Sequence, residues 1–224
     1  MTQSFAAIIL GGTGQVGGAA VAELLAIPGC REVVMVTRKP LAARTRVRNA
    51  VLDTSASDFA ERTCAVARDV LSQGPASAVS CAGVGSGSSR WSEEELRRLE
   101  LGVAGAFARG CHDAGIGQFC LLSAAGSSAR SRIRYARIMG MKEDTVRSIG
   151  FGRLAIFRPG IIAGNVHTPA WVAWLGQLVP GPFGTIDQRV LGRTIAAEIA
   201  LYSGEAGEVI LENTAIRRLA ARLR

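Results

Sequence analysis

The chain of 224 residues is 48% hydrophobic and carries a formal net charge of +8 at pH 7. These values exclude a disordered chain and fit a single α/β domain over residues 1–224. No apolar stretch reaches the length that crosses a bilayer, so we expect no membrane partner.

The five cysteines are scattered, odd in number and without a C-x-x-C pair. They indicate neither a zinc site nor a disulfide framework, and we expect no metal. Buried thiols of this kind are typical of a reducing compartment. The first apolar run begins so early that no signal peptide is expected before it. We therefore predict a cytoplasmic protein, with an organelle matrix as the alternative.

The basic balance, with a sequence pI near 10.1, is compatible with an anionic partner. Lys and Arg are spread along the chain, and no aromatic residues interleave with them as a stacking platform for bases. Nucleic acid is therefore the weaker interpretation. Attraction of an anionic cofactor explains the excess charge more simply.

A glycine-rich turn follows the first apolar run, and an apolar helical pattern follows the turn. Unpaired N–H groups at a helix start bind a pyrophosphate if the backbone can approach it closely. Gly11 would form the tight turn, Gly14 would admit the pyrophosphate, and Gly17 would let the helix pack closely. The alternative is a plain strand-to-helix turn. The predicted pyrophosphate site comprises Gly11, Gly12, Thr13, Gly14, Gln15 and Val16.

The second predicted strand, Glu32–Val36, leads into Thr37, Arg38, Lys39 and Pro40. No acidic residue lies between positions 33 and 40 to accept bonds from a ribose 2′-hydroxyl. Arg38 and Lys39 would instead suit a 2′-phosphate, so we predict NADP(H) as the cofactor. The alternative is a basic surface turn.

The remaining elements alternate between strand and helix patterns. We expect strands at residues 6–10, 32–36, 49–53, 77–82, 119–123, 154–157 and 209–211, and helices at 16–27, 59–71, 92–114, 133–149, 190–203 and 214–223, with a short helix or lid at 171–178. The alternation predicts a Rossmann-type, doubly wound parallel sheet with helices on both faces. Residues from about 163 to 224 would contribute a small substrate-side lobe.

Further cofactor contacts are expected where strands end. Asp53 ends the third predicted strand, where such folds place a polar residue near the adenine. The fourth strand ends in a glycine-rich turn on the ligand-binding edge, so this stretch is expected to pack along the cofactor. The residues predicted there are Cys81, Ala82 and Gly83.

These motifs resemble the short-chain dehydrogenase/reductase superfamily, and within it the atypical members of the Tat-interacting oxidoreductase-like family. The resemblance rests on the glycine turn, Thr37-Arg38, Leu121-Leu122-Ser123, Tyr135 with Gly140 and Glu143, and Phe157-Arg158-Pro159-Gly160. It implies NADP(H) binding and reduction of a small carbonyl or oxidation of an alcohol. It also implies that Pro159, Gly160, Ile161 and Tyr135 lie beside the nicotinamide end of the cofactor.

The superfamily's chemistry uses a serine and a Y-x-x-x-K pair, in which the ammonium favours the phenolate. Tyr135 is present, but Met139 stands in the lysine position. Lys142, two turns after Tyr135, is a candidate substitute; the alternative is a solvated helix lysine. Ser123 is the candidate serine, although relatives often have a second serine where this chain has Ala124. The Tyr135 ring could equally be packed with its hydroxyl on water.

Three functions follow. The first is an NADP(H)-dependent oxidoreductase with a degraded Tyr-Lys pair, and the second is an NADP(H)-binding regulatory module with a protein partner. The third is a nucleotide-sugar epimerase-like enzyme. In many relatives the helices corresponding to residues 94–114 and 133–149 pair between subunits, so a homodimer is expected by analogy. The stretch 165–185, which contains His167, has no recognisable substrate signature.

Overall fold

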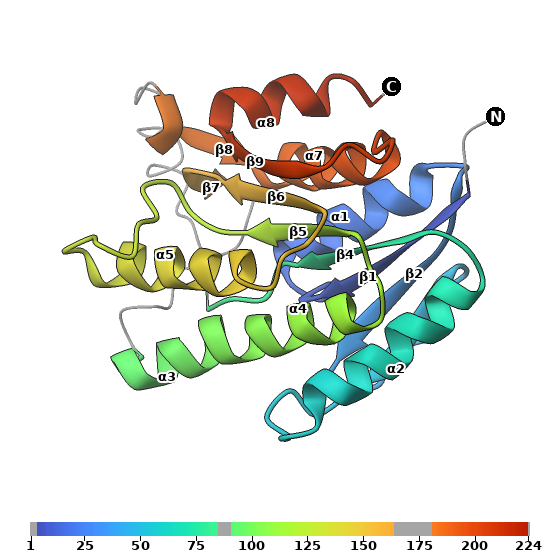
Figure 1. The fold of residues 1–224 in the computed structure, drawn as a ribbon. Helices are drawn as coiled ribbons and strands as arrows, with labels where there is room; N and C mark the ends of the chain where they lie inside the picture. Colours follow the sequence, from blue (N-terminus) through green and yellow to red (C-terminus); the bar gives the residue numbers. More distant parts are fainter. Residues whose placement is uncertain (1–3, 85–90, 164–180, 224) are drawn as a thin grey trace.

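The computed structural model describes residues 4–84, 91–163 and 181–223. Its centre is a sheet of seven parallel strands in the order β3-β2-β1-β4-β5-β6-β9 (Figure 1). The Rossmann-type doubly wound sheet predicted from the sequence is confirmed.

The strands of this sheet are β1 (Phe5–Leu10), β2 (Cys30–Thr37), β3 (Val47–Val51), β4 (Ala76–Ser80), β5 (Gln118–Leu122), β6 (Arg153–Arg158) and β9 (Gly207–Glu212). The α-helices are α1 (Gln15–Ala26), α2 (Phe59–Ser72), α3 (Glu93–Arg97), α4 (Ala104–Asp113), α5 (Arg134–Arg147), α7 (Gln188–Ala200) and α8 (Asn213–Ala220).

Two apolar cores lie on the two faces of the sheet. Successive residues of β1 alternate between them, so that Ile9 packs with α1, α7 and α8 while Ile8 packs with α2, α4 and α5. Figure 1 shows the same layers, with α2, α4 and α5 on one side of the strands. Strands covered on both faces are apolar throughout, which is why they were recognisable as short apolar runs.

The long helix predicted at 92–114 has a wide turn within it. α3 begins at the predicted capping box of Ser92 and Glu95, which is confirmed. A π-helical segment, Arg98–Val103, then connects α3 to α4. Such segments are frequent at functional sites, and this one contains the fully buried Glu100.

The third strand is displaced from its predicted position. It covers Val47–Val51 rather than 49–53, so Asp53 lies in the turn beyond it. The carboxylate accepts hydrogen bonds from the backbone and side chain of Ser55, a local arrangement that favours a turn over a strand.

The C-terminal part contributes mainly to the central layers. α7 packs on α1, and β9 pairs with β6 at the sheet edge. A small second sheet of β7 (Ile161–Ala163) and β8 (Thr185–Asp187) was not predicted. A substrate-side lobe in this part of the chain stays a prediction.

All five cysteine thiols are free, and four of them are buried, as predicted. Across the three described ranges, no helix combines the length and apolar character needed to traverse a membrane.

Candidate cofactor and active site

The turn between β1 and α1 is built from backbone alone. Gly11 adopts a φ of +82°, and a Cβ there would lie 2.6 Å from the amide nitrogen of Ala82. A Cβ on Gly17 would lie 2.1 Å from the carbonyl oxygen of Gly11. Gly14 is the N-cap of α1 and supplies no side chain to bond the first amide groups. The turn therefore leaves the helix start open to an anion, with Gly12, Thr13, Gln15 and Val16 around it.

Two cationic side chains stand at the end of the neighbouring strand β2. Arg38 and Lys39 are both exposed, and Arg38 has no hydrogen bond or ion pair with any described residue. The turn that carries them is fixed. Thr37 Oγ1 donates to the carbonyl oxygen of Lys39 at 2.7 Å, and Asn49 Oδ1 accepts from the amide of Leu41 at 2.9 Å.

Asn49 links this turn to β3. Its Nδ2 donates to Thr37 Oγ1 at 2.7 Å and to the carbonyl oxygen of Met35 at 3.1 Å. The sequence analysis did not single out this residue, because only the pairing of β2 with β3 brings Asn49 opposite Met35. Asp53 lies exposed beyond β3, and the hydrogen bonds from Ser55 hold its pKa below the usual value.

A buried ion pair lies against the chain that follows β4. The Lys142 ammonium is 2.9 Å from Glu100 Oε2, and the two side chains are 1% and 0% exposed. Lys142 Nζ also donates to the carbonyl oxygen of Ala82 at 2.9 Å, and the amide of Val84 donates to Glu100 Oε1 at 2.9 Å. A Cβ on Gly83 would lie 3.0 Å from the same carboxylate oxygen.

The solvated position considered for Lys142 is therefore wrong. The helix spacing placed Lys142 on the Tyr135 face of α5. It did not reveal that Glu100 of the π-helical segment packs against this face and pairs with Lys142. Burial raises the pKa of the neighbouring Cys81 thiol to about 12, with Lys142 opposing the shift.

Tyr135 lies in the first turn of α5 and is partly buried. Its hydroxyl has no hydrogen bond to the described residues. Burial raises the pKa of this phenol above its usual value, and the negative charge of Glu100 adds to the shift. Met139, one turn further, is 2% exposed and brings no charge. The phenol consequently stays protonated near neutral pH.

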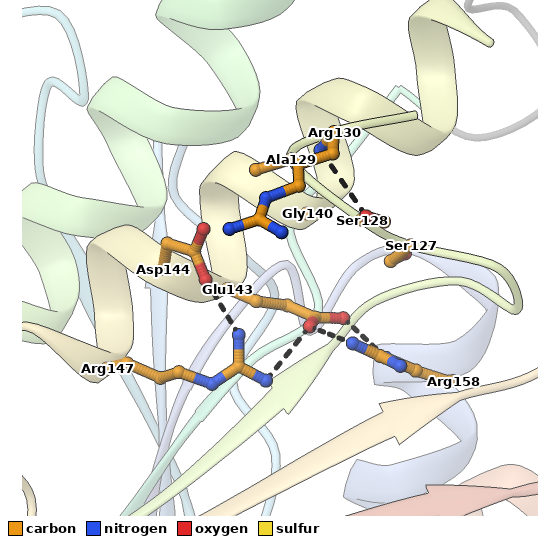
Figure 2. Close-up of a pocket in the computed structure, with 9 residues that line it drawn as sticks. All are labelled: Ser127, Ser128, Ala129, Arg130, Gly140, Glu143, Asp144, Arg147 and Arg158. Carbon is orange, nitrogen blue, oxygen red and sulfur yellow. Dashed lines mark hydrogen bonds and ion pairs between the residues drawn. The ribbon is translucent and has the colours of Figure 1, made fainter. Parts of the chain in front are cut away.

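Ser123 hydrogen-bonds a second cluster of charged side chains, separate from the Glu100–Lys142 pair. Its Oγ donates to Glu143 Oε1 at 2.5 Å and lies 3.1 Å from Ser127 Oγ. Glu143 is fully buried and also bonds Arg158 and Arg147 (Figure 2). These groups border an open cavity of about 320 Å³ between α5, the loop at 127–130 and the end of β6. The Ser123 proton thus points to a carboxylate within the protein.

The backbone after β6 is also internally bonded. Asn213 Oδ1 accepts from the Gly160 amide at 3.0 Å, and the carbonyl oxygen of Gly184 accepts from Ile161 at 3.2 Å. The carbonyl oxygen of Pro159 accepts from the amide of Ala125 at 2.8 Å. Pro159 therefore joins the loops after β5 and β6, whereas Gly160 and Ile161 are bonded to the start of α8 and to the residue before β8. His167 and the lid predicted at 171–178 lie outside the described residues.

The fold has many relatives among solved structures. dTDP-glucose 4,6-dehydratase DesIV of Streptomyces venezuelae, with NAD and TYD bound, matches 97% of this chain and 80% of its own at a TM-score of 0.67 and 18% identity. MoeE5 in complex with UDP-glucose and NAD matches 97% and 81% at a TM-score of 0.67 and 14% identity. At these identities the matches show a shared Rossmann-type fold.

Relatives by sequence are fungal. The chain is 33% identical over 157 residues to "Protein fmp52, mitochondrial" of Aspergillus clavatus and 30% identical to the protein of the same name from Aspergillus fumigatus. Each alignment covers 70% of this chain and 66% of the relative, so the chain spans just under two thirds of these curated relatives. No family model matches the chain.

These names correct the predicted location. The expectation of a cytoplasmic protein is wrong, because the sequence relatives are named as mitochondrial proteins. The reduced cysteines could not separate the two compartments. The Tat-interacting oxidoreductase-like family does not appear among the relatives described above.

Proposed function

We propose that the chain binds NADP(H) across the carboxyl ends of β1, β2 and β4, and uses it as an oxidoreductase on a small carbonyl or alcohol. The observation that carries this is the juxtaposition of a side-chain-free helix start at Gly14 with the exposed Arg38 on the adjacent strand. An acidic residue at that strand end would suit NAD; a guanidinium suits a 2′-phosphate.

Different residues would bind different parts of the cofactor. The first amides of α1 would hold the pyrophosphate, Arg38 and Lys39 the 2′-phosphate, and Asp53 the adenine end. Cys81, Ala82 and Gly83 would lie along the cofactor, with Pro159, Gly160 and Ile161 near its nicotinamide. When bound, the dinucleotide supplies or accepts the hydride.

The proton chemistry favours reduction. A phenol that stays protonated can donate its proton to a carbonyl oxygen as negative charge develops there, whereas oxidation of an alcohol needs the phenolate as base. Tyr135 would therefore act as the acid. The Ser123 oxygen, whose proton is given to Glu143, would accept rather than donate. Lys142 as a catalytic group stays a prediction that requires it to leave Glu100.

Relatives support this reading at a coarse level. The two solved neighbours described above carry NAD; one is a dTDP-glucose 4,6-dehydratase and the other binds UDP-glucose. A nucleotide-sugar epimerase-like activity is therefore kept as an alternative, tested by including UDP-glucose among the substrates. The finer assignment to the Tat-interacting oxidoreductase-like family and a homodimer remain parts of the proposal. The names of the fungal relatives favour a mitochondrial location.

The first test is a titration of NADPH and NADH followed by tryptophan fluorescence or heat. We expect preferential NADPH binding, and in Arg38→Ala a loss of about tenfold or more for NADPH with little change for NADH, because a charge-assisted hydrogen bond contributes about 1.5–3 kcal/mol. Arg109→Ala, on the exposed side of α4, is the matched control. Equal affinity for both nucleotides in the wild type would contradict the 2′-phosphate assignment.

A regulatory module is the second candidate. Met139 in place of a cation, together with a Lys142 already paired, favours a protein that holds the nucleotide without consuming it. NADPH turnover over a panel of carbonyl compounds, abolished by Tyr135→Phe, distinguishes the enzyme. Tight binding with no turnover, and a protein partner whose affinity depends on NADPH, distinguishes the module.

A further inference from the structure

The Glu100–Lys142 pair is the most fully buried pair of opposite charges among the described residues. Burial of two charges is costly, and a chain of this composition could fill the same volume with apolar side chains. The pair is also placed unusually, because it joins α5 to a π-helical segment rather than to a regular helix. The burial and placement of this pair therefore indicate a role beyond packing.

Each member of the pair also bonds the chain that leaves β4. Lys142 Nζ donates to the carbonyl oxygen of Ala82, and Glu100 Oε1 accepts from the amide of Val84, both at 2.9 Å. Gly83 lies between these two residues, and a Cβ there would lie 3.0 Å from the Glu100 carboxylate. The two charged groups thus hydrogen-bond both ends of the loop at residues 82–84. This loop is the one expected to pack along the cofactor.

The same helix carries Tyr135, two turns before Lys142. The charged or titratable groups near this end of α5 include Glu100, Lys142, the Cys81 thiol after β4, Arg134 beside Tyr135, and an ion pair between α3 and α5. In that ion pair, Arg137 lies 3.1 Å from Glu93, so its charges largely cancel. The negative charge of Glu100 is the one that acts on the phenol together with burial.

We propose that Glu100, acting through Lys142, is a positioning residue that ties the loop at 82–84 to α5 and so fixes the cofactor-side backbone relative to Tyr135. The inference deepens the proposed function and rests on it. Lys142 is one turn beyond the position of the missing lysine. Its ammonium donates to the protein's own loop and pairs with Glu100.

The test replaces the pair as a unit, because a single substitution would leave a buried charge unpaired and could unfold the protein. Glu100→Leu combined with Lys142→Met removes both charges and both bonds to the loop while keeping similar volume. The matched control is Arg153→Met with Glu198→Leu. That pair, at 2.8 Å, lies where β6 begins, at the sheet edge opposite the expected cofactor site.

Two measurements are made on each purified variant. The first is NADPH affinity. The second is the ionisation of Tyr135, followed by tyrosinate absorbance and assigned by comparison with Tyr135→Phe; the chain has only one other tyrosine, Tyr202. We expect the Glu100/Lys142 double variant to lose about tenfold or more in NADPH affinity, and Tyr135 to ionise at lower pH. The control should match the wild type in both.

A purely structural pair gives a different result. In that case the double variant, once folded, binds NADPH as the wild type does, and this finding overturns the proposal. If the wild type itself binds no NADPH, the proposed function has failed. Hydrogen exchange at the backbone amides of residues 82–84 then decides the inference, with faster exchange in the Glu100/Lys142 variant than in the control supporting the tie to α5 and equal exchange refuting it.

Discussion

The two halves of the candidate site treat charge in opposite ways. At the ends of β1 and β2, the helix start at Gly14 has no side-chain cap and Arg38 has no partner among the described residues. Around α5, Lys142 is held by Glu100, Ser123 by Glu143, and Glu143 by Arg158. The first half has hydrogen-bonding groups that are unpaired within the described residues and can bind a ligand. In the second half the charged groups are paired with one another.

This difference separates binding from chemistry. An anionic ligand at β1 and β2 would gain hydrogen bonds that the free protein lacks, so affinity can be high there. A substrate near α5 would have to displace internal bonds or rely on Tyr135, whose hydroxyl is free among the described residues. Changes around the glycine turn should therefore act mainly on nucleotide affinity, whereas removing one charge of a buried pair around α5 should act first on stability.

The largest effect is expected from breaking one member of the buried pair. Lys142→Met leaves Glu100 buried without a counter-charge, and we expect a loss of about 3–5 kcal/mol in the free energy of unfolding. Urea denaturation measures it. Arg97→Ala, in an exposed pair with Glu93, should cost less than about 1 kcal/mol. Similar losses in the two variants would show that the buried pair is not a special feature of α5.

The next effect concerns the glycine turn. In Gly17→Ala the new methyl group would overlap the carbonyl oxygen of Gly11. We expect a destabilisation of about 1–3 kcal/mol, and loss of measurable NADPH binding. Gly18→Ala is the matched control, because its Cβ has no neighbour closer than 3.6 Å and alanine favours helix. Retained NADPH affinity in Gly17→Ala would mean that the cofactor lies elsewhere.

Restoring the missing lysine would give the α5 half of the site a cation that is available to the active-site tyrosine. Met139→Lys places a cation one turn from Tyr135, which should lower the pKa of the phenol and allow alcohol oxidation. We expect turnover to rise by up to about a hundredfold, the low end of general acid–base catalysis. Met141→Lys adds the same charge at another position of α5 and should have no such effect. Unchanged turnover with unchanged NADPH affinity would show that the substrate pocket is lost as well.

The smallest effect is a pH dependence. The Cys81 thiol, whose pKa desolvation raises to about 12, and the Tyr135 phenol keep protons that the unfolded chain releases from about pH 9 upward. Stability is therefore full below that pH and falls as the pH rises, by at most about 1.4 kcal/mol per pH unit for each proton. Urea unfolding from pH 7 to 11 measures the slope, and Cys81→Ala should reduce it. A slope that Cys81→Ala leaves intact would assign the effect to other groups.

Local features of the sequence were sufficient for the fold and for the glycine turn. The apolar runs of β1, β2 and β5 and the capping box at Ser92 are each determined by neighbours within a few positions, and each was predicted correctly. The strands β7 and β8 have three residues apiece, too few for an alternating pattern, and they were missed.

The charges of the site depended on distant residues. Glu100 and Lys142 lie 42 positions apart, and Asn49 meets Thr37 only through strand pairing. Helical periodicity told which face of α5 Lys142 occupies, but it carries no information about what packs on that face. This is why a buried lysine was read as a solvated one.

The small sheet of β7 and β8 has a consequence for how such a protein can change. Ile161 pairs with Thr185, so the two ends of the stretch between them are held side by side. For a chain segment whose ends are already held together, added length costs little, about 0.6 kcal/mol for each doubling. New residues could be inserted there without shifting the register of β6 on β9. A longer chain could thus acquire a new substrate preference while its nucleotide-binding layers stay as they are.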